Sequence, residues 1–370
     1  MSGKRLFRQG GFLSGCGGPL AFLAAGCLLV GVFRLARKNR PAMEWVAAHI
    51  SVPFKRAASA LVDPLPFSGA EAVCLLVGCG ALAFLVRGIW RQIHGQGGLG
   101  SCLLVLAALA VWIYAGVCLF WGVHYYTESF EEKAGMTNEG VSLDQLEQAA
   151  LWFREKVNET APLVKRDENG DFGYTWQEIF ADSPGLYDGA LEEYPFLAGP
   201  ERSPKPALFS KLMSASNFTG YLFPFLGEST LNVDCPAVFI PVTVAHEFSH
   251  QRGVAQEEQA NFVGIEACIA SDKPAYVYSG YLFGYLHLTN ALWEADPERW
   301  ARVEEGLCAQ AKQDMALNNA YWAQYQEKVV ANTMQSVYEN FLYSYDQSMG
   351  IRSYGACVDL LAQKYGTQEN

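Results

Sequence analysis

The hydrophobic pattern divides the chain into an apolar N-terminal third and a longer part in which apolar and polar residues are mixed, mostly with helical periodicity. Three stretches of the first third, about residues 11–35, 69–89 and 101–123, are apolar over roughly membrane-spanning length and carry few or no internal charges. About twenty such residues cross the hydrocarbon core as a helix, which satisfies its own backbone hydrogen bonds there. The pattern therefore predicts a membrane domain over residues 1–124 with three transmembrane helices and the lipid bilayer as a partner.

The first apolar stretch resembles a signal peptide at its basic start, but its apolar residues continue past Cys27 to Arg34. That length favours an uncleaved span. The N-terminus carries basic residues before this span, and the second short loop carries Arg87 and Arg91, which favours a cytoplasmic location for both. The basic residues at 34–40 favour the opposite orientation. We therefore expect the large C-terminal domain to lie outside the cytoplasm.

Residues 36–68, between the first two apolar stretches, form a partly apolar, amphipathic loop. Apolar side chains such as Met43 and Trp45 are interspersed with the charged Lys55 and Arg56. A helix of this kind lies in the membrane interface, and we interpret the loop in this way. Because two spans separate the loop from the large domain, both lie on one side of the membrane, and the loop is also a candidate docking surface for that domain.

Residues 125–370 show the 3.6-residue periodicity of helices over most of their length. The predicted helices cover residues 143–156, 207–213, 242–252, 257–270, 276–291, 297–319 and 327–347. Two short runs, residues 172–176 and 233–240, have the pattern of strands, and the second leads directly into a helix. The expected fold class is mainly α, with three N-terminal transmembrane helices followed by one largely helical domain of roughly 240 residues.

Charge follows the same division of the chain. Residues 1–124 hold 11 Lys and Arg against 3 Asp and Glu, a net charge of +8, whereas residues 125–370 hold 16 against 35, a net charge of −19. Such an asymmetry is typical of two domains in different surroundings. The acidic character of the larger domain argues against nucleic acid as a partner.

The pentapeptide His246-Glu247-Phe248-Ser249-His250 lies in one of the predicted helices. Residues four apart share a face of a helix, so His246 and His250 can each point a ring nitrogen at one metal ion. Glu247 lies beside that ion and can take a proton from a water molecule. This division of labour is that of zinc peptidases with a His-Glu-x-x-His motif.

A catalytic zinc needs a third protein ligand and one open position. Gly253 can end the helix with a positive φ and let the chain turn back toward the ion. The next predicted helix begins at Glu257, which can bind the metal while Asn261, one turn later, hydrogen-bonds a ligand histidine. Glu258 is the alternative third ligand.

The spacing of the cysteines does not predict a second metal site. Six of the ten cysteines lie in or beside the apolar stretches, and the other four lack the spacing of metal ligands. Outside the cytoplasm those four could form one or two disulfides, and they are Cys235, Cys268, Cys308 and Cys357.

Over nearly its whole length the chain resembles DUF3810, a family of bacterial membrane proteins. The segments that carry the resemblance are Pro66-Phe67-Ser68, residues 121–126, 245–253, 257–262 and 278–281, and residues 350–355. The His-Glu-x-x-His and Glu-x-x-x-Asn pair is also similar to that of gluzincin-type membrane zinc peptidases, in which a glutamate is the third ligand and Asp usually stands at the position of Asn261. The resemblance implies a multi-pass protein of the bacterial cell membrane with a gluzincin-like domain.

These features lead us to expect a membrane-anchored zinc metallopeptidase that hydrolyses peptide or protein substrates. His246, His250 and Glu257 are the expected zinc ligands, and Glu247 is the expected general base and acid. Four residues in or near the family-like segments are candidate donors to the oxyanion, namely Tyr281, His287, Arg352 and Tyr354. The alternatives are a zinc-binding membrane regulator or sensor without turnover, and a structural membrane protein whose histidines bind no metal.

Overall fold

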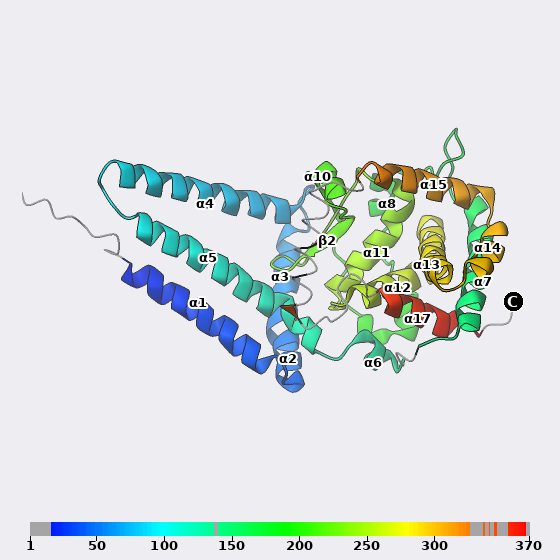
Figure 1. The fold of residues 1–370 in the computed structure, drawn as a ribbon, viewed down its shortest axis with the longest axis horizontal. Helices are drawn as coiled ribbons and strands as arrows, with labels where there is room; N and C mark the ends of the chain where they lie inside the picture. Colours follow the sequence, from blue (N-terminus) through cyan, green and yellow to red (C-terminus); the bar gives the residue numbers. More distant parts are fainter. Residues whose placement is uncertain are drawn as a thin grey trace, which may run out of the picture. The chain divides into compact units, whose positions relative to one another are not determined.

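The computed structural model describes residues 16–136, 140–325, 336, 340, 344–345 and 354–367. The chain forms two compact units (Figure 1). The first contains Met1–Phe54 and Gly69–Thr127, and the second contains Lys55–Ser68 and Glu128–Asn370. The end of the first loop, residues 55–68, thus belongs to the second unit, although the sequence analysis groups it with the membrane domain.

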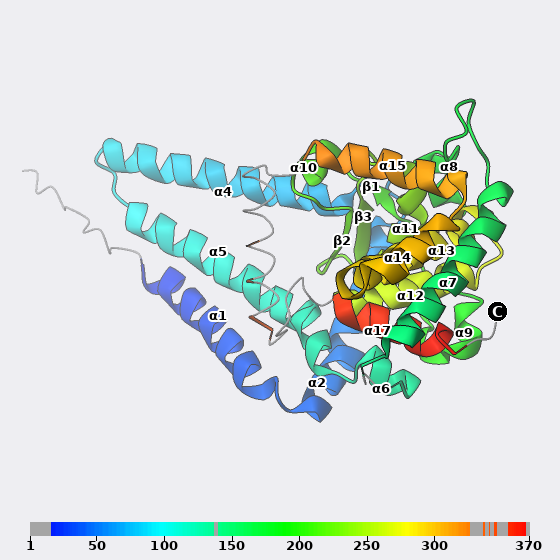
Figure 2. The same ribbon diagram turned by 45° about the vertical axis from the view of Figure 1, so that its right-hand side comes forward.

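The first unit contains three helices that are long and apolar enough to cross a membrane, α1 (Gly17–Ala36), α4 (Gly69–Ile93) and α5 (Leu99–Phe120). They match the three predicted spans, of which residues 11–15 lie outside the described part. Helices α1 and α5 lie side by side in both ribbon views (Figures 1 and 2). The chain is therefore a membrane protein with a helical N-terminal unit.

The remaining described helices of the first unit form the loop between the first two spans and the end of the third. Within the loop, α2 (Arg40–Val46), a π-helical turn (Ala47–Ser51) and α3 (Val52–Val62) follow one another without a break, and α3 passes into the second unit at Lys55. A 3₁₀ turn, Gly122–Tyr126, follows α5. The Ser51 hydroxyl donates a hydrogen bond to the Phe120 carbonyl, which joins the π-helical turn to the end of α5.

The second unit is mostly helical, with one small sheet. Its described helices are α6 (Phe130–Ala134), α7 (Leu143–Thr160), α8 (Trp176–Ala181), α9 (Ala190–Glu193), α10 (Ser210–Ala215), α11 (Ile240–Gln251), α12 (Glu257–Ile269), α13 (Pro274–Ala295), α14 (Pro297–Glu305), α15 (Ala309–Ala323) and α17 (Tyr354–Tyr365), and short 3₁₀ turns lie at Ala161–Leu163, Pro195–Leu197 and Ala237–Phe239. Its strands are β1 (Lys205–Pro206), β2 (Gly220–Phe223) and β3 (Glu228–Leu231).

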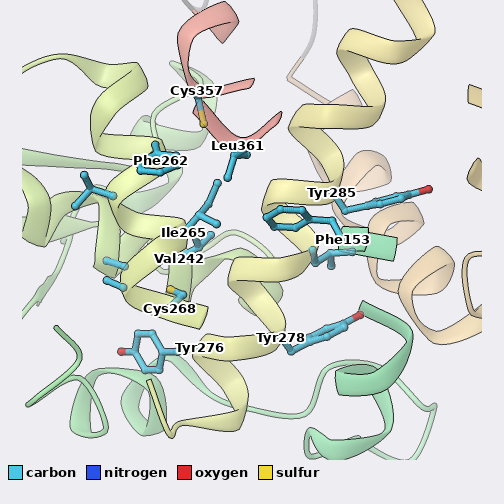
Figure 3. Close-up of a cluster of buried hydrophobic side chains, with 14 of the residues drawn as sticks. Phe153, Val242, Phe262, Ile265, Cys268, Tyr276, Tyr278, Tyr285, Cys357 and Leu361 are labelled. Atoms are coloured by element: carbon cyan, nitrogen blue, oxygen red, sulfur yellow. The ribbon is translucent and has the colours of Figure 1, made fainter. Parts of the chain in front are cut away.

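The core of the second unit lies around α13, which packs against α7, α11, α12, α14 and α17. Each neighbouring helix contributes apolar side chains to one cluster, as the close-up shows for Phe153 of α7, Val242 of α11, Ile265 of α12 and Leu361 of α17 (Figure 3). Gly284 of α13 lies directly against the Phe153 ring, so that the two helices approach closely. Packing of this kind fixes α11 and α12 relative to each other.

The three strands form a sheet in the order β1-β3-β2, with β1 parallel and β2 antiparallel to β3. Both β2 and β3 pack against α11. The sheet differs from the prediction. Residues 233–240 form no strand, because Pro236 interrupts the chain and an Asx turn, in which Asp234 N–H donates to Asn232 Oδ1, redirects it. Residues 172–176 hold only an isolated bridge between Phe172 and Arg166.

One predicted helix is split in the structure. The predicted helix at 297–319 is interrupted at Gly306, and α14 and α15 lie on either side of the break. The Asn158 side chain stabilises the break from α7, since its amide donates to the Gly306 carbonyl and its oxygen accepts from Cys308 N–H. Most of the predicted helix at 327–347 lies outside the described residues. Cys235, Cys268, Cys308 and Cys357 are free thiols.

Residues 55–68 are joined by hydrogen bonds to the small sheet and to the segment before β1. The Lys205 ammonium of β1 donates to the carbonyls of Asp63 and Leu65, at 2.5 and 2.7 Å, just after the end of α3. The Ser68 hydroxyl donates to Oε1 of Glu228 on β3, and Arg202 donates to the Ser59 hydroxyl. The last residues before α4 are thus part of the folded second unit.

The last described helix is tied to α12 by a buried polar cluster. Lys364 donates to Glu266 and Glu193 and to the Tyr194 hydroxyl, and the Tyr365 hydroxyl donates to the other oxygen of Glu266. Glu266 is only 4% exposed, so its charge depends on these partners.

Replacing Lys364 with Met is therefore expected to lower the free energy of unfolding by about 2 kcal/mol, because it leaves the buried Glu266 charge without its cation. The measurement is unfolding of the purified full chain in detergent. The control is Lys156→Met, whose ion pair with Glu159 is largely exposed and contributes less than about 1 kcal/mol. Equal stability losses in the two variants would contradict this role for Lys364.

Candidate metal centre

The first two candidate ligands lie on α11, which begins at Ile240 with Pro241 in its first turn, where a missing N–H costs no hydrogen bond. Val244, Ala245 and Phe248 are fully buried and hold one side of the helix against the core. The opposite side presents His246 and His250, whose rings meet edge to face with centroids 4.7 Å apart. The helical spacing thus brings the two imidazoles together.

Gly253 ends α11 with φ of 91°, as the sequence predicts. Val254 N–H donates to the Ser249 carbonyl and Gly253 N–H to the His250 carbonyl, which is the hydrogen-bond pattern of a Schellman motif. The same turn aims the Val254 carbonyl at His250, whose Nδ1–H donates to it at 2.6 Å. With the proton on Nδ1, Nε2 of His250 carries the lone pair that a metal ion requires.

Helix α12 begins at Glu257 and supplies the other side of the site. Its Asn261 accepts a hydrogen bond at Oδ1 from Nδ1–H of His246, at 2.8 Å. This bond leaves Nε2 of His246 as the metal-binding atom, in the same way as the Val254 carbonyl does for His250. An alanine Cβ at Gly264 would lie 2.9 Å from the backbone nitrogen of His246. The absence of a side chain at Gly264 therefore permits the close approach of α12 to α11.

The three candidate ligand atoms converge. Nε2 of His246 lies 3.2 Å and Nε2 of His250 lies 3.6 Å from Oε2 of Glu257. All three atoms lie within 4.8 Å of one another. Ligand atoms around a tetrahedral zinc ion, with bonds of about 2.0–2.1 Å, are separated by about 3.3 Å. The observed spacing and the two oriented imidazoles fit a zinc ion with one open position.

The charge state of Glu257 suits a metal ligand. Burial alone would raise the pKa of this carboxyl, but the positive charges that His250 and His246 carry when they are protonated hold it well below its usual value. Glu257 is thus an anion where positive charge lies beside it, which is the state that a metal ligand requires.

The carboxyl of Glu258, the alternative third ligand, lies in a different environment, near other carboxyl groups. Burial raises its pKa to about 8, and the nearby Glu131, Asp359 and Glu257 add to the rise. In the described residues, the only cluster of at least three metal-binding side chains consists of His246, His250 and Glu257. The geometry therefore favours Glu257 over Glu258.

Glu247 lies beside this cluster and is 3% exposed. Burial raises its pKa to about 8, the charge of His246 lowers it, and that of Glu257 raises it further. Its Oε2 atom has no hydrogen-bond partner among the described residues. Burying a carboxyl oxygen without a hydrogen-bond partner costs free energy on folding. Such groups occur at sites where the oxygen binds a ligand or takes part in proton transfer.

The oxyanion candidates are placed differently. His287 of α13 lies near His246. Burial lowers the pKa of His287 to about 4, and the charge of His246 makes a smaller contribution in the same direction. Tyr281 contacts the rings of Trp152 and Phe153 of α7 and belongs to the packing of the core. The backbone of Tyr354 begins α17, but its side chain lies outside the described part of the chain, as does Arg352.

Sequence reasoning missed several residues that position the site. The Tyr187 hydroxyl donates to the Ala245 carbonyl at 2.7 Å, and its ring lies 3.7 Å below the Arg252 guanidinium, which in turn pairs with Glu201. No sequence signal marks Tyr187. The role of Gly264 was detectable, since Ala260, Gly264 and Cys268 form a stripe of small residues at helical spacing, where two helices can pack closely.

Comparison with known proteins gives one match. The model of a family described as "Protein of unknown function (DUF3810)" matches residues 50–362, most of the 370-residue chain. No curated protein and no solved structure matches. The matched region includes the second and third spans and all the residues of the candidate metal centre.

Proposed function

The chain belongs to the DUF3810 family, and we propose that it is a membrane-anchored zinc metallopeptidase. The observation that carries this proposal is the convergence of His246, His250 and Glu257, each with its binding atom aimed at one point, beside a buried carboxyl at Glu247. A structural role alone would not require two histidines to be fixed in the same tautomer around a carboxylate.

A zinc ion held by His246, His250 and Glu257 would supply Lewis acidity, which lowers the pKa of water toward neutrality. The residues around it hold its ligands and move the proton. Asn261 and the Val254 carbonyl orient the two imidazoles. Glu247 accepts the proton of the attacking water at its free Oε2 atom and delivers it to the leaving amine, a role that its pKa near neutrality suits.

The strand β2 supports a peptide as the substrate. The carbonyl of Leu231 on β3 accepts a hydrogen bond from Ala207 N–H, on the β1 side of the sheet. Leu231 and Gly220, which lie opposite each other on β3 and β2, therefore form a pair without hydrogen bonds between them. The backbone N–H and C=O groups of Gly220 therefore point away from β3. Those of Leu222, two residues further along β2, do the same. In the described sheet this is the outer edge, where an extended peptide can add a strand.

Gly220 also lies against the proposed base. A Cβ at this position would lie 2.7 Å from Oε1 of Glu247. Gly220→Ala is therefore expected to displace the Glu247 carboxyl and to lower kcat roughly tenfold to a hundredfold, with zinc content unchanged. The measurement is turnover with bound zinc, beside Gly140→Ala, where an added Cβ meets nothing. Full turnover by Gly220→Ala would contradict this contact.

The proposal is tested by incubating the purified full chain, loaded with zinc, with a diverse peptide mixture and identifying products by mass spectrometry. We expect cleavage that a zinc chelator abolishes and added zinc restores. The large unit is proposed to act outside the cytoplasm of a bacterial membrane, the side that the charge pattern favours. Absence of any zinc-dependent cleavage would favour the alternative of a zinc-binding regulator.

A further inference from the structure

Three large apolar side chains are exposed on the second unit around α10. Leu208 is 73%, Phe209 41% and Leu212 59% exposed. They belong to a rigid segment, because the opposite side of α10 is fixed to the core. There the Ser210 hydroxyl accepts from Val233 N–H, and the Asn232 amide donates to Ser214. We call Leu208, Phe209 and Leu212 the apolar patch.

Only a few residues and one hydrogen bond separate the patch from Gly69, where α4 begins. Lys205, three residues before Leu208, donates to the Leu65 carbonyl, and Leu65 is four residues from Gly69, where α4 begins. Four residues span at most about 14 Å. Phe67, two residues before that helix, is itself 51% exposed.

The link between the patch and the entry point is firm. The Ser68 hydroxyl, in the residue directly before α4, donates to Glu228 of β3, and β3 pairs with β1, which leads into the patch. The patch and the residue directly before α4 thus belong to one folded unit, joined by hydrogen bonds.

Charge distinguishes this part of the surface from the rest of the unit. Residues 125–370 carry a net charge of −19, which an anionic lipid surface repels. Residues 201–216 and 55–68 together hold five basic residues against two acidic ones. Lys205 and Lys55 are buried, so Lys211 and Arg56 are the exposed basic residues of these segments. Exposed Lys211 lies between Phe209 and Leu212, so a cation accompanies the apolar side chains.

We propose that the apolar patch inserts into the interface of the lipid bilayer near Gly69 and holds the second unit against the membrane. Apolar side chains with an interspersed cation, in a unit whose chain continues directly into a membrane-spanning helix, suit a lipid surface with anionic headgroups. This contact is independent of the proposed peptidase activity. It would keep the metal centre at a fixed height above the bilayer.

The test uses the full chain in nanodiscs of phosphatidylcholine and phosphatidylglycerol, with a photoreactive benzophenone amino acid at position 212. Because Leu212 is exposed, the substitution is compatible with folding, and position 208 serves as a second site. The control is position 317 on α15, where Leu317 is 43% exposed. After illumination, lipid adducts are measured by mass spectrometry.

We expect a several-fold higher yield of lipid adduct at 212 and 208 than at 317. Yields at both sites no higher than at 317 would overturn the proposal. Adducts to protein instead of lipid would overturn it too, since they would identify another part of the chain or a second copy as the occupant of the patch.

Discussion

Glu247→Gln is expected to keep the full zinc content of the protein and to reduce peptide hydrolysis by about 10²–10⁴-fold. Glutamine has nearly the shape of glutamate but cannot accept a proton at neutral pH, so the ligands His246, His250 and Glu257 stay in place. The measurement pairs metal analysis with the rate of cleavage of one identified peptide. Because the buried Oε2 of Glu247 has no partner in the described structure, its loss removes no hydrogen bond seen there.

A matched control for Glu247→Gln is Glu258→Gln, one residue beyond Glu257. Glu258 is partly buried among carboxyl groups and outside the ligand cluster, so its replacement should leave hydrolysis near the wild-type rate. Equal turnover by Glu247→Gln and wild type would rule out Glu247 as the general base. Loss of zinc from Glu247→Gln would show that this residue holds the metal.

Gly264→Ala is expected to weaken zinc binding roughly tenfold to a hundredfold. The added Cβ would lie 2.9 Å from the backbone nitrogen of His246 and 3.1 Å from its Cα, and a helix backbone cannot yield as a side-chain end can. Helix α12 must then move away from α11, which carries Glu257 and Asn261 away from the histidines. Titration with a competing chelator measures the affinity.

The comparison for Gly264→Ala is Gly284→Ala, which overpacks the core against the Phe153 ring, at the contact of α13 with α7. Both variants should unfold at lower temperature, but only Gly264→Ala should show the large loss of zinc affinity. Equal losses of affinity would mean that α12 is not positioned by its contact with His246.

The elements that the sequence predicts well are those with a local signal. The three spans follow from uninterrupted apolar residues, and α11 and α12 follow from their periodicity and from Gly253, whose positive φ ends α11. The pairing of Asn261 with His246 also follows from spacing, because Glu257 and Asn261 share one face of α12.

The elements that the sequence hides depend on contacts between distant segments. Strand β3 is fully buried although Glu228, Ser229 and Thr230 are polar, so no alternation of apolar and polar residues marks it. Its polar side chains are satisfied from elsewhere, Glu228 by Ser68 and Ser229 by Gln251. The same holds for Gly220, whose importance appears only where β2 meets Glu247.

The measurement that tests the central claim most directly is zinc stoichiometry by elemental analysis of the full chain, purified in detergent, beside Glu257→Ala. We expect about one zinc ion per wild-type chain and weaker zinc binding in the variant, since a catalytic centre of this kind has three protein ligands. A wild-type chain without zinc, even after reconstitution with the metal, would contradict the account and favour a structural role for the two histidines.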